Sequence, residues 1–341
     1  MIDLNQSTNT TYFNLPNEIY IDSLHRGFTE KTAKLHKLAA RRFLELTNIN
    51  EFSEKTTYQD VKPYLLSYLE DCRQRDMGHA AIKAHFSGLS NLFIYLLDEG
   101  KIRINPVPSF RARYVRVYKA TPPAPKQDLS ISDVEYLVNA CSCPKLRAIL
   151  LIFSLTGIRV NELITLNLQD FLKNDGFLIL CPDKSKRTNN IIPISAQIRD
   201  AIEDYLYMRN DEKRPTDPLF LNEFNTGRIV EKQIRLKIAG LGEITGLHNP
   251  AKEAQSFEKL TPHTFRHFFT KMMREQGMGI SHVAEMRGDK RSFFAMQDWY
   301  YSISYRELKK EYDLYIPIFR LNHIGMRGAA FHTMSKRSLE V

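Results

Sequence analysis

Two arginines, a histidine and a tyrosine are the residues of this chain whose chemistry fits together best. His263 and Arg266 stand three residues apart in His-Thr-Phe-Arg. Arg159 lies upstream in Leu-Thr-Gly-Ile-Arg-Val-Asn-Glu-Leu, and Tyr300 lies downstream in Asp-Trp-Tyr-Tyr. In a helix that begins near His263, this residue and Arg266 share a face. Two guanidinium groups can hold both non-bridging oxygens of a phosphodiester, and a histidine can move a proton near neutral pH. The set favours covalent catalysis on a nucleic-acid backbone.

A tyrosine nucleophile needs help to ionise, and its leaving group needs a proton. The reference pKa of tyrosine is about 10, and two nearby guanidinium groups favour the phenolate of Tyr300. Lys184 lies in the basic run 183–190, which reads as the loop of a β-hairpin. Beside a scissile phosphate, its ammonium could protonate the departing 5′ oxygen, a role open also to Lys186 and Arg187. For Lys184, a solvated lysine on a loop is the simpler alternative. For Tyr300, one tyrosine among sixteen is not by itself evidence of catalysis.

Each remaining candidate also has a purely structural explanation. Arg159 follows a helix that reads as fully buried, where a salt bridge to Glu162 at i+3 would satisfy its charge. His263 follows Pro262 and can be a capping histidine. His267 and the phenylalanines around it indicate packing rather than chemistry.

Composition limits the class of protein without deciding it. The chain has 341 residues, 43% of them hydrophobic, which is enough for two domains with real cores. Its net charge of +9 favours a polyanionic partner. The four cysteines lack the spacing of a disulfide framework or a zinc site, so free thiols are expected. A polar N-terminus and short apolar runs predict a soluble cytoplasmic protein, associated with the nucleoid, with no membrane segment.

The first domain is predicted to be a helical bundle over residues 17–118, after a flexible lead at 1–16. Helices are expected at 31–46, 61–73 and 79–98, with Gly100 as a stop for the third. The apolar stripe of the first of these contains Leu35, Leu38, Ala39, Phe43 and Leu46. The bundle also carries cations that suit phosphates, although a solvated helix surface explains them equally well: Lys34, Lys37, Arg41, Arg42 and Lys83.

A basic, proline-rich linker at 119–128 separates this bundle from a second domain at 129–317. Arg113, Arg116 and Lys119, in and just ahead of the linker, are further candidates for DNA contact. A capping box formed by Ser132 and Glu135 is expected to start the second domain. Helices are expected at 145–156, 159–166, 196–209, 228–239, 264–276 and 280–287, and a β-hairpin is expected at 177–181 and 191–194. The fold class is thus mainly α with a small β-hairpin (α+β), arranged as a two-domain DNA clamp. A basic tail follows at 318–341.

The residues named above resemble the tyrosine recombinase (phage integrase) family. Arg159 in Thr-Gly-Ile-Arg, Lys184 on the hairpin, the His263-x-x-Arg266 pair and Tyr300 occur in the order and rough spacing of that family. The combination of Thr-Gly-Ile-Arg with His-x-x-Arg-His is far more specific than either half. The leading bundle resembles the family's core-binding (SAM-like) domain, so the resemblance covers about residues 17–317. Met-Arg-Gly-Asp-Lys at 286–290, followed by Trp-Tyr-Tyr at 299–301, resembles integrases of archaeal type.

The resemblance implies a site-specific DNA recombinase that works on double-stranded DNA as a tetramer, with no metal, ATP or other cofactor. Arg159 and Arg266 would bind the non-bridging oxygens, and Tyr300 would form a 3′-phosphotyrosyl link. Lys184 would protonate the leaving 5′ hydroxyl, and His263 would assist proton transfer. Tyr301 is the alternative nucleophile. A type IB topoisomerase or resolvase is a rival with the same chemistry.

Asp289 departs from the family pattern. It stands where many members carry the histidine of Leu-Gly-His, a hydrogen-bond donor that an ionised aspartate cannot replace. The carboxylate could orient Arg266 or Lys290, with Trp299 as a substitute donor. The same residue is the one hint of a non-catalytic DNA-binding protein that has kept the fold. The tail is hypothesised to dock on a neighbouring protomer or on DNA.

Overall fold

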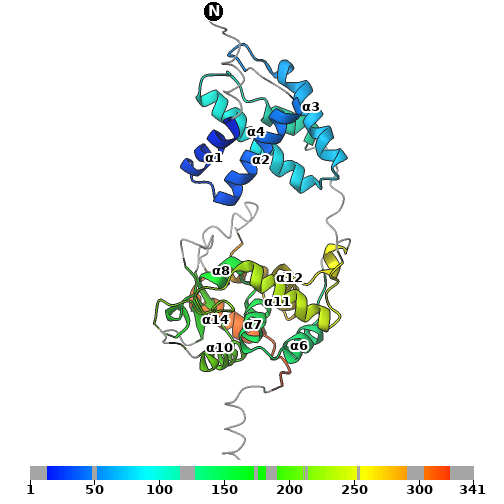
Figure 1. The fold of residues 1–341 in the computed structure, drawn as a ribbon. Coiled ribbons are helices and arrows are strands. Elements are labelled where there is room, and N and C mark those ends of the chain that lie inside the picture. Colours follow the sequence, from blue (N-terminus) through cyan, green and yellow to red (C-terminus); the bar gives the residue numbers. More distant parts are fainter. Residues whose placement is uncertain are drawn as a thin grey trace, which may run out of the picture. The chain divides into compact units, whose positions relative to one another are not determined.

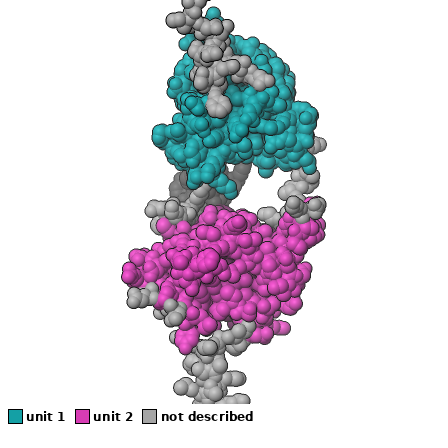
Figure 2. All heavy atoms as spheres, in the orientation of Figure 1, with its two compact units in different colours: residues 1–123 teal, residues 124–341 magenta. Residues whose placement is uncertain are grey.

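The computed structural model describes residues 14–47, 52–115, 127–172, 176–181, 190–209, 211, 214–251, 254–289 and 303–322. The chain divides into two compact units, residues 1–123 (unit 1) and 124–341 (unit 2), which are coloured separately in Figure 2. The division falls inside the segment predicted as a linker. Each unit encloses its own cluster of buried apolar side chains.

Unit 1 is a bundle of helices whose centre is α2. Its elements are α1 (Leu15–His25), α2 (Glu30–Thr47), α3 (Tyr58–Gln74), α4 (His79–Asp98), α5 (Val107–Phe110) and the π-helical turn η1 (Arg111–Val115). The helix α2 contacts α1, α3 and α4 (Figure 1). Edge-to-face aromatic contacts join these helices, since the ring of Phe43 meets those of Tyr68 and Phe93.

The buried face of α2 differs from the predicted stripe. Leu38 is 53% exposed and Leu46 36% exposed, whereas Ala39 and Ala40 are fully buried. The reason is a close approach of α2 to α4. A Cβ placed on Gly88 of α4 would lie 2.8 Å from the Cβ of Ala39, so only small side chains fit where the helices cross. The larger leucines lie off this line and face outward.

Unit 2 is built around a central helix that is apolar on nearly every side. Its helices are α6 (Ile131–Ala140), α7 (Pro144–Thr156), α8 (Val160–Thr165), α9 (Gln169–Leu172), α10 (Ala196–Met208), α11 (Glu231–Ile244), the 3-10 turn η3 (Ser256–Glu258), α12 (Pro262–Glu275), α13 (Ile280–Arg287) and α14 (Tyr305–Tyr315). The central helix α7 contacts α6, α10, α11 and α12 (Figure 1). A helix covered on all sides needs no polar face, which explains its composition.

The predicted β-hairpin is present and short. Strand β1 (Phe177–Ile179) pairs antiparallel with β2 (Ile191–Pro193), and the buried Leu178 stands opposite the buried Ile192. The fold is therefore mainly α with one small sheet, as the sequence predicted. Residues 183–189 of the basic run between the strands lie outside the described residues. None of the described helices is both long and apolar enough to cross a membrane.

The cap of α6 lies two residues earlier than predicted. The capping box joins Ser130 and Asp133, not Ser132 and Glu135: the Asp133 carboxylate accepts from the backbone N–H of Ser130 at 2.8 Å, and the Asp133 N–H donates to Ser130 Oγ at 3.1 Å. The same spacing of serine and acid occurs twice in succession, and the earlier pair starts the helix. Glu135 instead accepts from the backbone N–H of Arg320 at 2.7 Å.

That contact belongs to a C-terminal segment, 316–322, which lies against its own unit. Side-chain amides hold its backbone. Gln197 of α10 both donates to the carbonyl of Phe319 and accepts from its N–H. Asn139 of α6 donates to the Arg320 carbonyl and accepts from the Asn322 N–H. Residues 318–322 of the predicted tail therefore lie on unit 2, and residues 323–341 lie outside the described residues.

Candidate active site

Arg159 is placed by the sharp turn between α7 and α8. The helix α7 ends at Gly157, whose φ of 63° is a left-handed conformation that glycine adopts without strain. Arg159 then caps α8, and its backbone N–H donates to Glu162 Oε2 at 2.7 Å. Its Nη1 donates to Oε1 of the same carboxylate at 3.2 Å. Glu162 is only 2% exposed, so its charge depends on this partner. The predicted salt bridge is present.

Arg266 points inward from the first turns of α12. It is 7% exposed, and its Nη1 donates to the carbonyl of Gly157, so the turn after α7 also orients this second arginine. His263 is exposed, on the turn that precedes Arg266. His267 is exposed as well, which corrects the expectation that it packs: it follows Arg266 directly, and one residue along a helix turns a side chain by about 100°.

Asp289 joins the two arginines. Its Oδ1 accepts from Nη2 of Arg159 at 3.1 Å and from Nη2 of Arg266 at 2.7 Å. Its Oδ2 lies 3.1 Å from Nη2 of Arg287. Three guanidinium groups therefore surround one carboxylate, and each presents one terminal nitrogen to it. Of the roles considered for Asp289, contact with Arg266 is observed, while Lys290 and Trp299 lie outside the described residues.

The end of α13 supplies the other acceptors for Arg159. Nη1 donates to the carbonyl of Arg287 at 3.1 Å and Nη2 donates to the carbonyl of Gly288 at 3.0 Å. Gly288 ends α13 with a φ of 61°, in the left-handed conformation. The guanidinium of Arg159 is thus fixed by Glu162, by the end of α13 and by Asp289, which holds it still for a ligand. Its side chain remains 36% exposed, so solvent and ligands can reach it.

The site carries a surplus of positive charge. Three arginines (159, 266 and 287) face two carboxylates (Glu162 and Asp289), which leaves one net positive charge. The arginine side chains at positions 266 and 287 are 8% and 30% exposed, so water screens them only in part. Guanidinium groups arranged in this way bind an oxyanion through several charge-assisted hydrogen bonds.

Arg287 was not among the residues proposed from the sequence. The sequence signal for it is the segment Arg-Gly-Asp at 287–289, of which only the aspartate was predicted to belong to the site. A basic residue in the last turn of a helix ordinarily indicates a helix-dipole contact. Its contact with Asp289 depends on the left-handed Gly288 between them, which turns the chain back on itself.

Several predicted residues lie outside the described residues. These are Arg116, Lys119, Lys184, Lys186, Arg187, Tyr300 and Tyr301.

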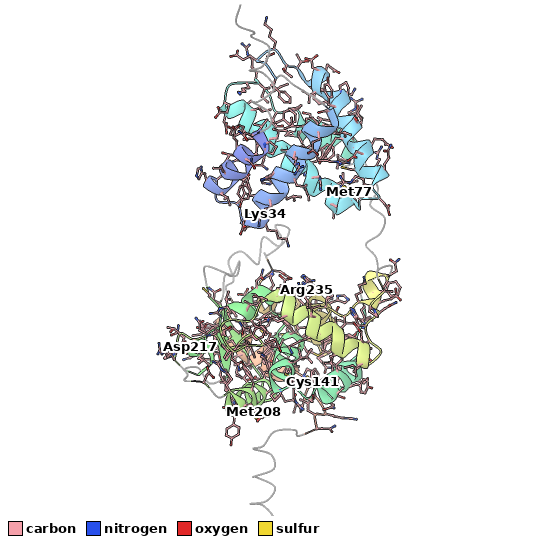
Figure 3. The ribbon with its side chains drawn as sticks, in the orientation of Figure 1. Lys34, Met77, Cys141, Met208, Asp217 and Arg235 are labelled. Carbon is pink, nitrogen blue, oxygen red and sulfur yellow. The ribbon has the colours of Figure 1, made fainter. Side chains whose placement is uncertain are left out.

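The predicted DNA-binding cations of unit 1 differ in their surroundings. Three have carboxylate partners in the bundle: Lys34 with Glu30, Arg41 with Glu45, and Arg42 with Asp71. Lys34, labelled in Figure 3, projects from α2 and is 66% exposed. Lys37 and Arg113 lie over the rings of Tyr20 and Tyr114. Lys83 and Arg111 line a pocket of about 400 Å³.

Comparison with known sequences identifies the family. The sequence profile of the phage integrase family matches residues 127–306, more than half of the 341 residues. The chain belongs to the phage integrase family. Its match begins near the start of unit 2 and includes all three arginines that contact Asp289. As a member of this family the chain is a site-specific recombinase, an enzyme that transfers DNA strands, and these sequence predictions are confirmed.

Curated relatives match this integrase over most of its length. A tyrosine recombinase XerC of Thermodesulfovibrio yellowstonii is 29% identical over 294 residues, which cover 82% of this chain and 89% of the relative. A tyrosine recombinase XerD of Listeria monocytogenes serovar 1/2a is 25% identical over 287 residues, or 80% and 90% of the two chains.

Solved structures share the fold at lower identity. The Tn1549 transposon integrase in complex with circular intermediate DNA has a TM-score of 0.59 and 18% identity, over 87% of this chain and 98% of that one. A lambda integrase tetramer bound to a Holliday junction has a TM-score of 0.57 and 16% identity, over 85% and 80%. Both comparisons show that this integrase has the tyrosine recombinase fold.

Proposed function

We propose that this integrase cuts and rejoins DNA through a 3′-phosphotyrosyl intermediate formed by Tyr300. The phenolate oxygen attacks the scissile phosphorus, a bond to tyrosine forms, and the bond to the 5′ oxygen breaks. The free 5′ hydroxyl of a second strand then attacks the same phosphorus and releases the tyrosine. Because each step exchanges one phosphodiester bond for another, no external energy source is required.

The arginines 159 and 266 are the phosphate-binding groups of this mechanism. The observation that carries the proposal is their convergence on one anionic group, Asp289, from helices far apart in the sequence. Their fixed orientation stabilises charge that develops on the non-bridging oxygens, and they favour the phenolate of a neighbouring tyrosine.

Two further groups carry protons. Lys184 donates a proton to the departing 5′ oxygen, and His263, exposed near the start of α12, assists transfer to or from the reacting oxygens. Both assignments rest on position in the sequence and on the family resemblance. Tyr301 is the alternative nucleophile, because it directly follows Tyr300.

The substrate is double-stranded DNA, and the working assembly is a tetramer. Support comes from the neighbours, which include an integrase bound to circular intermediate DNA and an integrase tetramer on a Holliday junction. Within unit 1, residues 17–118 would act as the core-binding domain, with the basic linker 119–128 between it and the catalytic domain 129–317. The protein would act in the cytoplasm, on DNA of the nucleoid, with the rest of its tail, residues 323–341, on a neighbouring protomer or on DNA.

Covalent trapping tests the chemistry. Duplexes that bind the protein are first selected from a random-sequence pool, and a nick is placed so that religation is impossible. We expect a covalent protein–DNA band with wild type and Tyr301→Phe, and its loss in Tyr300→Phe. Loss only in Tyr301→Phe would move the nucleophile by one residue. A bound DNA that never gives an adduct would favour the non-catalytic alternative.

A further inference from the structure

Asp289 already holds the position of a ligand in the arginine site. Its Oδ1 accepts from Arg159 and Arg266, and its Oδ2 forms an ion pair with Arg287. A phosphodiester also presents two oxygens that share one negative charge, so the carboxylate matches it in charge and in acceptor number. The arrangement is a complete anion site whose occupant is part of the same chain.

The surroundings decide which contact of Arg159 can be exchanged. Its four terminal N–H groups point at Glu162, at the carbonyls of Arg287 and Gly288, and at Asp289. Glu162 is 2% exposed and accepts one of these N–H groups as well as the backbone N–H of Arg159 that caps α8, so it stays in place. The carbonyls belong to the end of α13. Asp289 is 34% exposed, so among these acceptors of Arg159 it is the one whose side chain has room to rotate into water.

The geometry points to Asp289 as an internal occupant of a three-arginine phosphate site, which the scissile phosphate displaces when DNA binds. The exchange replaces one anion by another and leaves all three guanidinium groups paired. It also assigns Arg287 as a third phosphate-binding residue. This inference rests on the proposed function, because it assumes that the arginine pair binds the scissile phosphate.

The occupied site has two consequences for the free protein. Three close guanidinium groups repel one another, so a bound carboxylate stabilises the fold around them. The same carboxylate lowers the apparent affinity for any other anion, since the competent site is available only when Asp289 has left. Removing its charge should therefore raise phosphate affinity and lower stability in the absence of phosphate.

Titration with inorganic phosphate tests the exchange without any DNA site. The full-length protein is titrated by calorimetry in a chloride buffer, as wild type, as Asp289→Asn and as Asp200→Asn. Asp200 lies exposed on α10, so its variant is a control for the same change in net charge. We expect Asp289→Asn to bind phosphate about tenfold more tightly than wild type, and Asp200→Asn to resemble wild type. Equal affinity of Asp289→Asn and wild type would overturn the inference.

A double variant locates the bound phosphate. In Asp289→Asn with Arg287→Leu, most of the gain in phosphate affinity should disappear, because one of the three donors is lost. If the full gain survives, Arg287 is not part of the site and the three-arginine assignment is wrong.

Thermal unfolding covers the case in which Asp289→Asn folds poorly. Phosphate should raise the melting temperature of Asp289→Asn more than that of wild type, at matched ionic strength. An Asp289→Asn protein that phosphate does not restore would show that the carboxylate is structural.

Adduct formation on the nicked DNA separates this inference from the proposed function. Asp289→Asn should form the adduct at least as fast as wild type, whereas a large loss would make Asp289 a positioning residue and overturn the displacement. If phosphate binding behaves as expected but wild type forms no adduct, the anion site stands and the catalytic proposal fails.

Discussion

The backbone carbonyl of Gly157 accepts a hydrogen bond from Nη1 of Arg266, a residue 109 positions further along the chain. Gly157 also lies close against the ring of Phe269, one turn beyond Arg266 on α12. A Cβ at Gly157 would lie 2.4 Å from this ring. The end of α7 and the start of α12 are therefore held together at the point where Arg159 and Arg266 are oriented.

Gly157→Ala should destabilise unit 2 and disturb Arg266. The left-handed φ costs roughly 1–2 kcal/mol for an L-residue, and the clash with Phe269 adds roughly 1–3 kcal/mol. Gly246→Ala is the matched control, since Gly246 has a φ of 74° and open space around its Cβ position. In urea unfolding, Gly157→Ala should lose clearly more free energy than the control. Equal losses would mean that Phe269 moves aside at little cost.

The buried carboxylate of Glu162 should matter more than an exposed one in a similar pair. Glu162→Gln removes the charge that holds Arg159 and should cost roughly 2–4 kcal/mol of unfolding free energy, together with a loss of covalent adduct. Glu231→Gln is the control, because the Glu231–Arg235 pair on α11 is 40% and 46% exposed and contributes less than about 1 kcal/mol. Similar costs for both variants would contradict the role given to Glu162.

A lysine cannot replace Arg266. Arg266→Lys keeps the charge but loses the planar fork that reaches Gly157 and Asp289 together. We expect adduct formation on the nicked DNA to fall by roughly 10²–10³-fold. Arg235→Lys, at an exposed position of α11 (Figure 3), should leave the rate of adduct formation within roughly two- to threefold of wild type. An Arg266→Lys protein of nearly full activity would remove the arginine from the phosphate site.

Unit 1 should lose stability in mild acid because of His36. Asn91 Nδ2 lies 3.2 Å from Nε2 of His36, and Ser23 Oγ lies 2.9 Å from Nδ1. The oxygen of Asn91 accepts from Arg26, so its amide nitrogen is the group that faces His36. An amide nitrogen only donates, so Nε2 must accept and the ring is neutral, with Nδ1 donating to Ser23.

Burial, with the nearby charge of Arg26, lowers the pKa of His36 below its ordinary value. The unfolded chain therefore binds the proton more readily, so this contribution to stability is present above about pH 6.5 and is lost as the pH falls toward the folded pKa. The loss is at most about 1.4 kcal/mol per pH unit. His36→Gln should flatten the acid slope of the unfolding free energy, and His25→Gln, at an exposed position of α1, should not. An unchanged slope in His36→Gln would exclude this histidine as the cause.

Local signals in the sequence predicted the helices well. The helix expected at 79–98 is α4, because its apolar periodicity and the glycine that follows are both contained in one segment. The buried helix before Gly157 was equally clear. The exposed leucines of α2 were predicted wrongly, since burial there depends on Gly88 of another helix.

The sequence predicted which residues belong to the candidate site but not how they contact one another. Arg159, Arg266 and Asp289 were all singled out, but the sequence gives no distance between α8, α12 and the end of α13. The carboxylate looked unsuitable because it cannot donate to a phosphate. Only its position between three guanidinium groups indicates that the carboxylate can take the place of a phosphate.

The side-chain amides that bind the C-terminal segment, 316–322, provide a route by which a force on the tail would reach unit 2. Asn139 holds the backbone at Arg320 and Asn322, and it lies on α6, the first helix after the linker. A pull on the chain beyond Asn322 would load these hydrogen bonds before it reached the apolar core. Tension on the tail would thus reach Asn139 of α6 and Arg147 of the central helix α7 first, through their hydrogen bonds to the backbone of Arg320 and Asn322.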